Sequence, residues 1–343
     1  MARELLRVNR FLLFVVRLFI LLKHRRLSLW YLDKDGFGRL PNPALPRTLN
    51  DKYFWRKVFD RAPVFTRISD KILVREWLKE QNIDVQSPEI LWTGTRPEDI
   101  PDTLLTNGVV VKANHGSGTN VMLEAPPADR EAFNERLHRY LRKDYGRKKL
   151  EWAYFDIERR ILVERRIPNI NAEFKFYTFG ERLERLVMIH DRFEEISADI
   201  WVPDGKGGWA LENEKAMVSS RQGNKPLPQS MEAAEALARE IGKRFDHMRV
   251  DILTDGKEIW FSEVTIYSMA GYFRSGIGDD PEHRMNLAWS LSDSWFMKTK
   301  QTGWRKWYKR ALESTGDVTG RTAPQGLYGH TTHRDQALLA EHD

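Results

Sequence analysis

The segment from Met248 to Glu263 constrains the fold of this chain more than any other stretch. A run of strand-forming residues at 250–253 precedes a Thr-Asp-Gly-Lys sequence that is typical of a hairpin turn, and a second such run follows at 259–261. The pattern predicts a β-hairpin whose two strands carry three charged residues: Arg249, Asp251 and Glu263.

The length of the turn decides whether the two carboxylates share one face of the hairpin. A two-residue Asp-Gly loop would place Glu263 and Asp251 on opposite faces of the hairpin, because side chains alternate along each strand. A three-residue loop at 254–256, with its glycine in the left-handed conformation, would place Asp251, Phe261 and Glu263 on one face. We favour the three-residue loop, which makes the hairpin a candidate metal site.

Two carboxylates that converge from neighbouring strands repel each other unless a cation lies between them. Ligands that are all oxygen favour a hard ion such as Mg²⁺, which commonly bridges the phosphates of a nucleotide. The alternative interpretation is an ordinary surface hairpin whose charged side chains face water.

Composition narrows the class of protein. A chain of 343 residues is long enough for two or three packed lobes. It has no cysteine, which excludes disulfides, a thiolate nucleophile and a Cys-based zinc site. The formal net charge of +6 favours anionic partners. Basic residues are mixed with acidic ones and no nucleic-acid-binding motif occurs, so nucleic acid is not expected as a partner.

Residues 1–48 form an apolar and basic leader with a linker rich in Pro and Gly. The apolar run at 11–22 contains Arg17 and is shorter than the roughly 20 residues that cross a bilayer. It also lacks the small-residue cleavage site of a secretory signal. Two interpretations remain: a helix in the membrane interface, which implies a cytoplasmic protein held at the inner face of the membrane, or a helix docked on the protein's own core.

The remaining chain divides by pattern into four regions. Residues 49–108 are mainly helical, and residues 109–168 hold strands around a glycine-rich loop. Residues 169–300 contain further strands, a helix and the hairpin. Residues 301–343 begin with the end of a basic aromatic helix and continue as a polar tail that we expect to be disordered.

A small-residue loop between two strand-like runs occupies residues 114–120. The backbone N–H groups exposed by Gly116 and Gly118 can bind an anion, and Lys112 just before the loop supplies a positive charge. The Gly-Lys-Ser/Thr ending of a Walker loop is absent. A phosphate-binding loop is one interpretation, and a plain hairpin turn is the other.

Taken in order, these motifs resemble the ATP-grasp fold, and more closely its TupA-like branch, which is predicted to act in teichuronopeptide and other cell-surface polysaccharide biosynthesis. The resemblance extends from about Leu49 to Tyr272. It implies an α+β fold in which a nucleotide is held between a small central lobe and a larger C-terminal lobe. The motifs that carry it are Leu-Asn-Asp-Lys at 49–52, Ser-Asp-Lys at 69–71 with Val-Arg at 74–75, residues 111–118, Phe-Lys-Phe at 174–176, Asp-Arg-Phe at 191–193 and Arg-Val-Asp at 249–251.

The resemblance implies ATP and Mg²⁺ as cofactors. Lys112, Lys175 and Arg249 would be the catalytic cations, and Glu164 would accept hydrogen bonds from adenine or ribose at the hinge. The implied nucleotide contacts are Lys112, His115, Gly116, Ser117, Gly118, Thr119, Asn120, Glu164, Lys175 and Phe261.

The implied metal ligands are Asp251 and Glu263. Thr265 stands where the wider fold usually has an Asn as a further ligand, and its hydroxyl is a poorer one. On the substrate side the candidates are Asp191, Arg192 and His115, with Arg192 as a clamp for a carboxylate.

The implied reaction is activation of a carboxylate as an acylphosphate, followed by attack of an amine or another nucleophile. The substrate would be an acidic small molecule or glycan precursor of capsule, exopolysaccharide or a cell-wall polymer. Two alternatives from other classes are a sugar-nucleotide transferase and a non-catalytic, membrane-associated nucleotide-binding protein.

Overall fold

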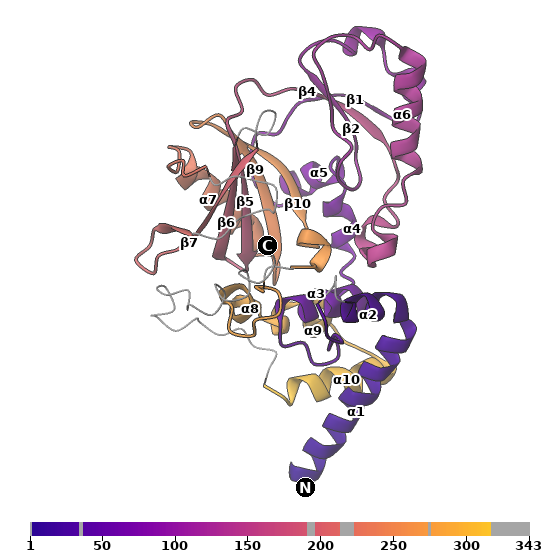
Figure 1. Ribbon diagram of the computed structural model, residues 1–343, viewed down its shortest axis with the longest axis vertical. Helices are drawn as coiled ribbons and strands as arrows, with labels where there is room; N and C mark the ends of the chain where they lie inside the picture. Colours follow the sequence, from indigo (N-terminus) through magenta and orange to yellow (C-terminus); the bar gives the residue numbers. More distant parts are fainter. Residues whose placement is uncertain (1, 34–36, 191–195, 213–222, 274–275, 317–343) are drawn as a thin grey trace, which may run out of the picture.

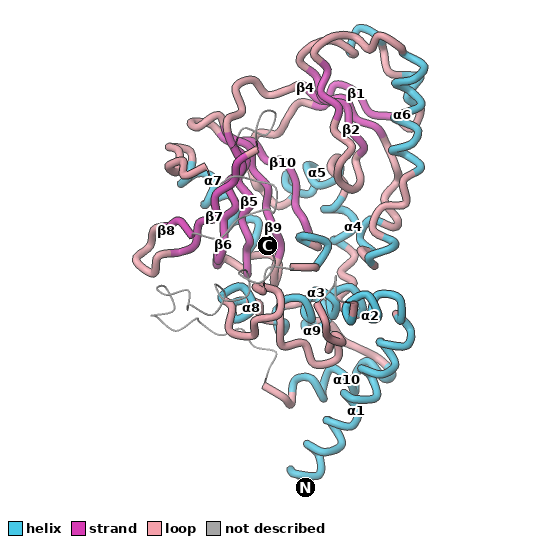
Figure 2. Tube along the Cα trace, in the orientation of Figure 1, coloured by secondary structure: helices cyan, strands magenta, loops and turns pink. Residues whose placement is uncertain are grey.

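The computed structural model describes residues 2–33, 37–190, 196–212, 223–273 and 276–316, with side chains from residue 7 onward. Two lobes, each built on an antiparallel sheet, lie beside each other, and a layer of helices lies at one end of the larger lobe (Figures 1 and 2). Residues from both lobes line the cleft between them.

The small lobe is a four-stranded antiparallel sheet in the order β1-β4-β2-β3. Helix α6 (Arg130–Arg142) covers one face of the sheet, where Phe133 and Leu137 pack on Val111. Because β1 pairs with β4, the lobe begins near residue 90, and the expectation that it begins at residue 109 is wrong. The strands are β1 (Ile90–Gly94), β2 (Val109–Ala113), β3 (Val121–Leu123) and β4 (Ile161–Arg165), with short 3-10 turns at η1 (Pro97–Asp99), η2 (Asp102–Leu104), η3 (Arg147–Lys149) and η4 (Trp152–Tyr154).

The large lobe is a six-stranded antiparallel sheet in the order β10-β9-β5-β6-β7-β8. Helix α7 (Met231–Gly242) buries Ala234, Leu237, Ala238 and Ile241 against one face of this sheet. The strands are β5 (Ala172–Phe179), β6 (Arg182–His190), β7 (Ser197–Pro203), β8 (Trp209–Glu212), β9 (Met248–Thr254) and β10 (Ile259–Thr265).

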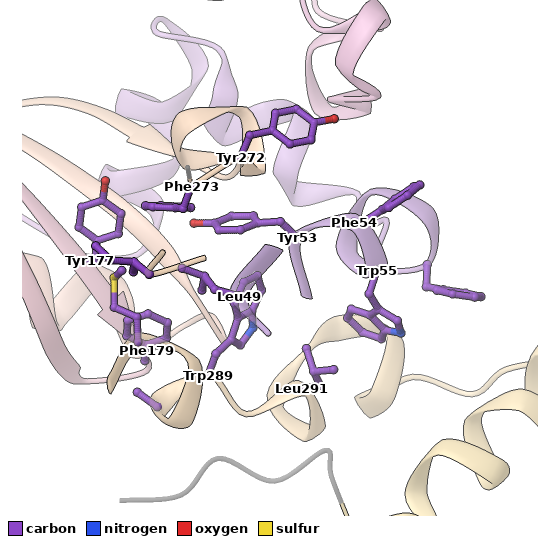
Figure 3. Close-up of a cluster of buried hydrophobic side chains, with 14 of the residues drawn as sticks. Leu49, Tyr53, Phe54, Trp55, Tyr177, Phe179, Tyr272, Phe273, Trp289 and Leu291 are labelled. Atoms are coloured by element: carbon purple, nitrogen blue, oxygen red, sulfur yellow. The ribbon is translucent and has the colours of Figure 1, made fainter. Parts of the chain in front are cut away.

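The other face of the large sheet is divided between a packed part and the cleft. Aromatic residues from the helix layer cover its lower part, where Tyr53 of α3 (Leu49–Val58) stacks on Phe273, and Phe273 contacts Tyr177 of β5 (Figure 3). Lys175, two residues before Tyr177 on the same face, lies beyond this packing. The short elements of this layer are η5 (Ser268–Gly271), α8 (Arg284–Ala288), η6 (Leu291–Asp293) and α9 (Trp295–Lys298).

Two short helices, α4 (Val64–Ser69) and α5 (Leu73–Glu80), connect the layer to the small lobe. Phe65, Ile68, Trp77 and Leu78 are buried in the same hydrophobic cluster as helix α7. The turn between the two helices therefore belongs to the large lobe, while its Lys71 N–H donates to the Asn114 carbonyl of the small lobe at 3.0 Å.

The chain begins with α1 (Ala2–Lys23) and α2 (Arg25–Leu32), and α1 packs on α10 (Gly303–Glu313) (Figure 1). One face of α1 buries Leu13, Val16 and Ile20. For that face, the interpretation of a helix docked on the protein's own core is therefore confirmed. No helix in the described part of the chain is long and apolar enough to cross a membrane. The tail expected to be disordered, residues 317–343, lies outside the described residues.

The hairpin forms as expected, but its turn is longer. Thr254 pairs with Ile259, so the loop between them has four residues, and the expected three-residue loop is wrong. Gly256 within it is left-handed, as predicted, with φ 101°. A bulge at Ser262 shifts the register by one residue and brings Glu263 opposite Asp251, so the two carboxylates do share a face.

The same bulge separates Phe261 from these carboxylates. Phe261 pairs with Ile252 and is fully buried with it in the hydrophobic cluster under α7. The expectation that Phe261 shares a face with Asp251 is therefore wrong, because only residues beyond the bulge change register.

Arg56 joins the helix layer to the large sheet. Its guanidinium donates to the Asp246 carboxylate at 2.6 Å and to the His247 carbonyl at 2.7 Å, and it lies 4.5 Å over the Trp289 ring. A second carboxylate, Asp60, lies 3.7 Å from the guanidinium and is also fully buried.

We predict that Arg56→Ala lowers the free energy of unfolding by about 3–5 kcal/mol, because it leaves the two carboxylates buried without their cation. Urea denaturation measures this change. Arg67→Ala is the matched control, since Arg67 pairs with Glu80 at 2.6 Å on the surface, where such pairs contribute little. Equal losses in the two variants would contradict the prediction.

Candidate active site

A cavity of about 380 Å³ lies where the two lobes meet. The connection between β4 and β5, residues 166–171, forms one wall. Apolar side chains share the lining with charged and polar ones, which suits a ligand that has both an apolar and a charged part. The lining includes Val110, Lys112, Asn120, Met122 and Glu164 from the small lobe and Glu173, Ile189, Leu253 and Ser262 from the large lobe.

Glu164 holds two cations at the small-lobe side of the cavity. Its Oε2 lies 2.5 Å from Lys112 Nζ, and its Oε1 accepts a hydrogen bond from Arg75 of α5. Burial lowers the pKa of Lys112, and Glu164 offsets part of that effect. The arrangement indicates that Glu164 orients Lys112, while its contact with adenine or ribose stays a prediction.

The glycine loop between β2 and β3 folds back on the end of β2. Gly116 and Gly118 are both left-handed, with φ 70° and 72°. A Cβ on Gly116 would lie 2.6 Å from the Tyr145 ring, so a side chain at this position would clash. The Thr119 hydroxyl accepts from the Ala113 N–H at 3.2 Å, and the Ser117 hydroxyl bonds to the Tyr145 hydroxyl at 3.0 Å.

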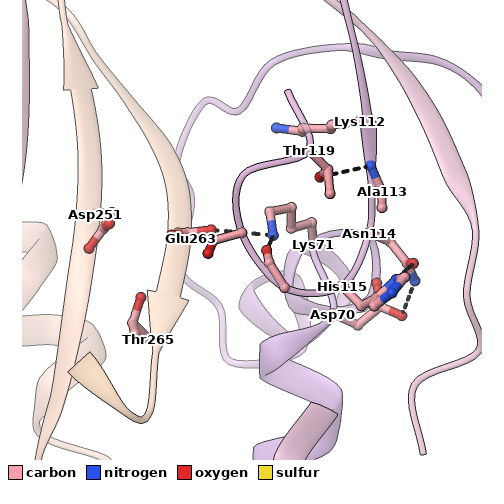
Figure 4. A network of polar contacts seen from close by, with 12 residues as sticks. Asp70, Lys71, Lys112, Ala113, Asn114, His115, Thr119, Asp251, Glu263 and Thr265 are labelled. Carbon is pink, nitrogen blue, oxygen red and sulfur yellow. Dashed lines mark hydrogen bonds and ion pairs between the residues drawn. The ribbon is translucent and has the colours of Figure 1, made fainter. Parts of the chain in front are cut away.

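The base of the loop is fixed by buried polar groups. Asp70 accepts from the Ile72 N–H at 2.8 Å, and its second oxygen accepts from the Asn114 side chain at 2.8 Å (Figure 4). The His115 ring lies 3.4 Å from the Asn114 side chain and 3.4 Å from the Lys143 carbonyl. Burial lowers the pKa of His115 to about 4. These contacts suit a residue that stabilises the loop.

Lys71 is the cation that the sequence analysis did not assign to the site. Its ammonium donates to the Gly116 carbonyl at 2.5 Å and lies 3.4 Å from Glu263 Oε2, so it joins the glycine loop to the hairpin (Figure 4). The Ser-Asp-Lys motif at 69–71 could have pointed to Lys71, but the same motif is also typical of the N-terminus of a helix.

Asp251 is the centre of the charge network on the large lobe. Arg249 holds it in a bidentate pair at 2.6 and 2.7 Å, and Lys175 donates to it at 2.6 Å. Burial alone would raise the pKa of Asp251, but Arg249 and Lys175 together hold it at about 2. Glu173 shares Lys175, also at 2.6 Å. The carboxylate therefore stays ionised at neutral pH.

The residues present fit a metal ion that is held partly by the protein and partly by a bound nucleotide. Asp251 and Glu263 face the cleft as cross-strand neighbours, and the Thr265 hydroxyl already accepts from Arg249 at 3.0 Å. Across the described residues, no group of three or more His, Cys, Asp or Glu side chains could hold a metal. Mg²⁺ would need further oxygen ligands, which the phosphates of a nucleotide provide.

The structure thus brings Lys175, Arg249, Asp251 and Glu263 together in one ion-pair network on the large lobe. Lys112 and Glu164 pair at the wall of the cavity, which Asn120 of the glycine loop also lines. Asp191 and Arg192 lie outside the described residues. Leu253, Ser262, Ile189 and Met122 line the cavity without having been expected, because which strand face meets the cleft depends on register.

Two antiparallel sheets that meet at a cleft, with Lys112 and a glycine loop on the small lobe and Lys175, Asp251 and Glu263 on the large lobe, define an ATP-grasp fold. The chain belongs to the TupA-like ATP-grasp family, whose model matches residues 51–280. No functionally curated protein matches the chain.

Solved structures are similar over part of their length. D-alanine–D-alanine ligase from Bacillus anthracis, complexed with ATP, is 16% identical with a TM-score of 0.32, and the match covers 58% of this chain and 55% of that one. N5-carboxyaminoimidazole synthase from Aspergillus clavatus is 13% identical with a TM-score of 0.36, covering 74% of this chain and 53% of that one. The chain thus spans little more than half the length of these proteins.

We predict that His115 makes the protein less stable as the pH falls. Its folded pKa of about 4 lies below the ordinary 6.5, so the unfolded chain takes up a proton that the folded chain does not. The stability present above pH 6.5 is lost progressively until the pH reaches about 4. Thermal melting of His115→Asn between pH 7 and 4.5 should show a shallower decline than the unsubstituted protein.

The control for this experiment is His138→Asn. His138 lies on the outer part of α6, where its ring contacts Glu98 at 2.5 Å. This substitution should leave the slope of melting temperature against pH steeper than that of His115→Asn. Parallel curves for the two variants would show that His115 does not contribute as predicted.

Proposed function

We propose that this protein is an ATP- and Mg²⁺-dependent ligase. It activates a carboxylate as an acylphosphate and joins it to an amine or another nucleophile, in the biosynthesis of a cell-surface polysaccharide. Membership of the TupA-like ATP-grasp family supports the proposal. The observation that carries it is the convergence of four cations on one cleft beside the carboxylate pair: Lys71, Lys112, Lys175 and Arg249.

The cavity has the chemistry for a nucleotide. Apolar side chains from both lobes, Met122, Ile189 and Leu253 among them, offer surfaces for a base. Lys112 borders the same cavity and supplies a positive charge for phosphate, and Lys71 stands by the carbonyl of Gly116 in the adjoining loop. The polyphosphate would then run from the cavity toward the hairpin.

The charged groups of this chain would act by position and electrostatics. Asp251 raises the pKa of Arg249 well above its ordinary value, although burial alone would lower it, so Arg249 is a permanent cation. Its bond to the Ser268 hydroxyl at 3.1 Å and its bidentate pair with Asp251 fix its orientation. A fixed cation stabilises the charge of a phosphoryl group in transfer without reorganising.

Asp251 and Glu263 would hold the Mg²⁺ ion, which when bound offsets the charge of the phosphates. Asp251 already shares its oxygens with Arg249 and Lys175, so these cations would balance its charge in the loaded site. The substrate class that fits this surplus of positive side chains is an acidic precursor.

A sugar-nucleotide transferase is the second candidate. One Asp-x-Asp sequence, of the kind that holds a metal in such enzymes, occurs at Asp33-Lys34-Asp35. It directly follows α2, and residues 34–36 lie outside the described part of the chain. The proposed metal ligands, Asp251 and Glu263, instead pair across the hairpin that the family model includes.

We predict that ATP with Mg²⁺ raises the melting temperature of the purified protein, since a ligand that binds only the folded state stabilises it by mass action. The rise should shrink when Mg²⁺ is omitted and in the Asp251→Asn/Glu263→Gln variant. Thermal-shift titration with ATP, ADP and UDP-sugars measures it. A rise with UDP-sugars alone would replace the ligase with the transferase.

We also predict that Lys112→Ala and Glu263→Ala each lower ATP turnover by about a hundredfold or more, the usual effect of removing one preorganised charge. Phosphate release in the presence of a panel of carboxylates and amines measures turnover. Lys206→Ala and Glu232→Ala, which remove exposed charges of the same kinds, should leave it unchanged. Full turnover in folded Lys112→Ala and Glu263→Ala would refute the proposal.

A further inference from the structure

Helix α1 is apolar on the face that it does not bury. Opposite the buried Leu13, Val16 and Ile20, a stripe of large apolar side chains faces outward at the three- and four-residue spacing of one helix face. Its centre is Phe11, 68% exposed, and Leu22, 66% exposed. The full stripe is Val8, Phe11, Phe14, Val15, Leu18, Phe19 and Leu22.

Helix α10 extends this stripe from the other end of the chain. Trp304 is 46% exposed and packs edge-on against Phe19 of α1, with ring centroids 6.3 Å apart. Trp307, one turn further along α10, is 59% exposed. A surface built from residues 8–22 and from two tryptophans almost 300 positions later is a feature of the folded protein rather than of a loose leader.

The charge of the chain is concentrated at the same place. Residues 1–32 contain seven Arg and Lys and one acidic residue, Glu4, a net charge of +6 that equals that of the whole chain. The basic residues flank the stripe: Arg7 and Arg10 are exposed beside its first turns, and Lys23, Arg25 and Arg26 follow its last. Arg305, Lys306 and Arg310 are also exposed, on α10.

We propose that this surface, the outward stripe of α1 with Trp304 and Trp307, docks on a bilayer that contains anionic lipid. An apolar face with basic flanks is the pattern of helices that lie in the membrane interface, and tryptophan favours the same depth. The apolar side chains enter the acyl boundary while the arginines and lysines contact lipid phosphates.

The charge pattern argues against a second copy of the chain as the occupant. In a two-fold dimer each surface patch meets its own counterpart, so the basic flanks would face basic flanks. The only acidic residue in the first 32 is Glu4, which leaves the surface almost without a complementary charge of its own. Anionic lipid supplies that charge.

Docking in this way sets the orientation of the enzyme. Helices α1 and α10 lie at the end of the molecule opposite the small lobe (Figure 1). The cleft between the lobes would therefore be held away from the bilayer, separated from it by the helix layer. Substrate would reach it from the aqueous side.

The test is flotation of the full-length protein with vesicles of phosphatidylcholine alone or with phosphatidylglycerol added, in low and high salt and without nucleotide. We expect binding to the anionic vesicles that weakens in high salt and with phosphatidylcholine alone. Leu18→Ser/Leu22→Ser should lower the partition coefficient at least about tenfold, because leucine side chains lose their transfer into the lipid.

The matched control is Leu73→Ser/Leu211→Ser, two leucines 38% and 36% exposed elsewhere on the protein. It should bind vesicles like the unsubstituted protein.

Brominated lipid should quench tryptophan fluorescence less in Trp304→Phe/Trp307→Phe than in the unsubstituted protein. The proposal is overturned by a lack of binding to anionic vesicles in low salt, by equal losses in both leucine variants, or by a dimer that only Leu18→Ser/Leu22→Ser dissociates. Flotation uses no nucleotide, so its outcome is independent of the ligase activity.

Discussion

The pairing of buried Asp251 with Arg249 and Lys175 is the interaction on which the site depends. A carboxylate without exposed surface is costly unless its charge is balanced by bonded cations. Here the three residues come from two neighbouring strands in fixed register, Lys175 directly opposite Asp251. These contacts therefore tie the charge of the site to the register of the sheet. A shift of one residue between β5 and β9 would turn either Lys175 or the pair of Arg249 and Asp251 into the core under α7.

The alternation of side chains along β5 gives the large sheet two different faces. One face is packed under α7, and the other is shared between the charged site and the helix layer. Residues 174 and 176 of β5 are buried with α7, while residues 173 and 175 project into the cleft and Tyr177 meets the aromatic packing of the helix layer. One strand thus serves the core, the site and the layer. The aromatic cluster ends at Tyr177, and the charged network begins two residues earlier at Lys175, which is bonded to Glu173 and Asp251.

Residues in strong local patterns could be predicted from the sequence, and those whose place depends on long-range register could not. The hairpin, the glycine loop and the grouping of Lys112, Lys175, Arg249, Asp251 and Glu263 followed from short motifs in order. The bulge at Ser262 leaves no mark in composition, so the face of Phe261 was predicted wrongly. Strand β1 was missed as part of the small lobe because its partner, β4, lies almost 70 residues later. Lys71 reached the site only through tertiary packing of α4 and α5.

Helix α1 has one consequence for work with the protein itself. Because its outward stripe is apolar, deleting α1 would be an obvious way to improve solubility. Its inner face, however, is part of the hydrophobic cluster that contains Tyr308, Ala311 and Leu312 of α10 and reaches Tyr53 and Trp289. Truncation would exchange one exposed apolar surface for another and loosen the layer that supports β5. Polar substitutions in the stripe leave the inner face intact, so we expect them to improve solubility without loosening this layer.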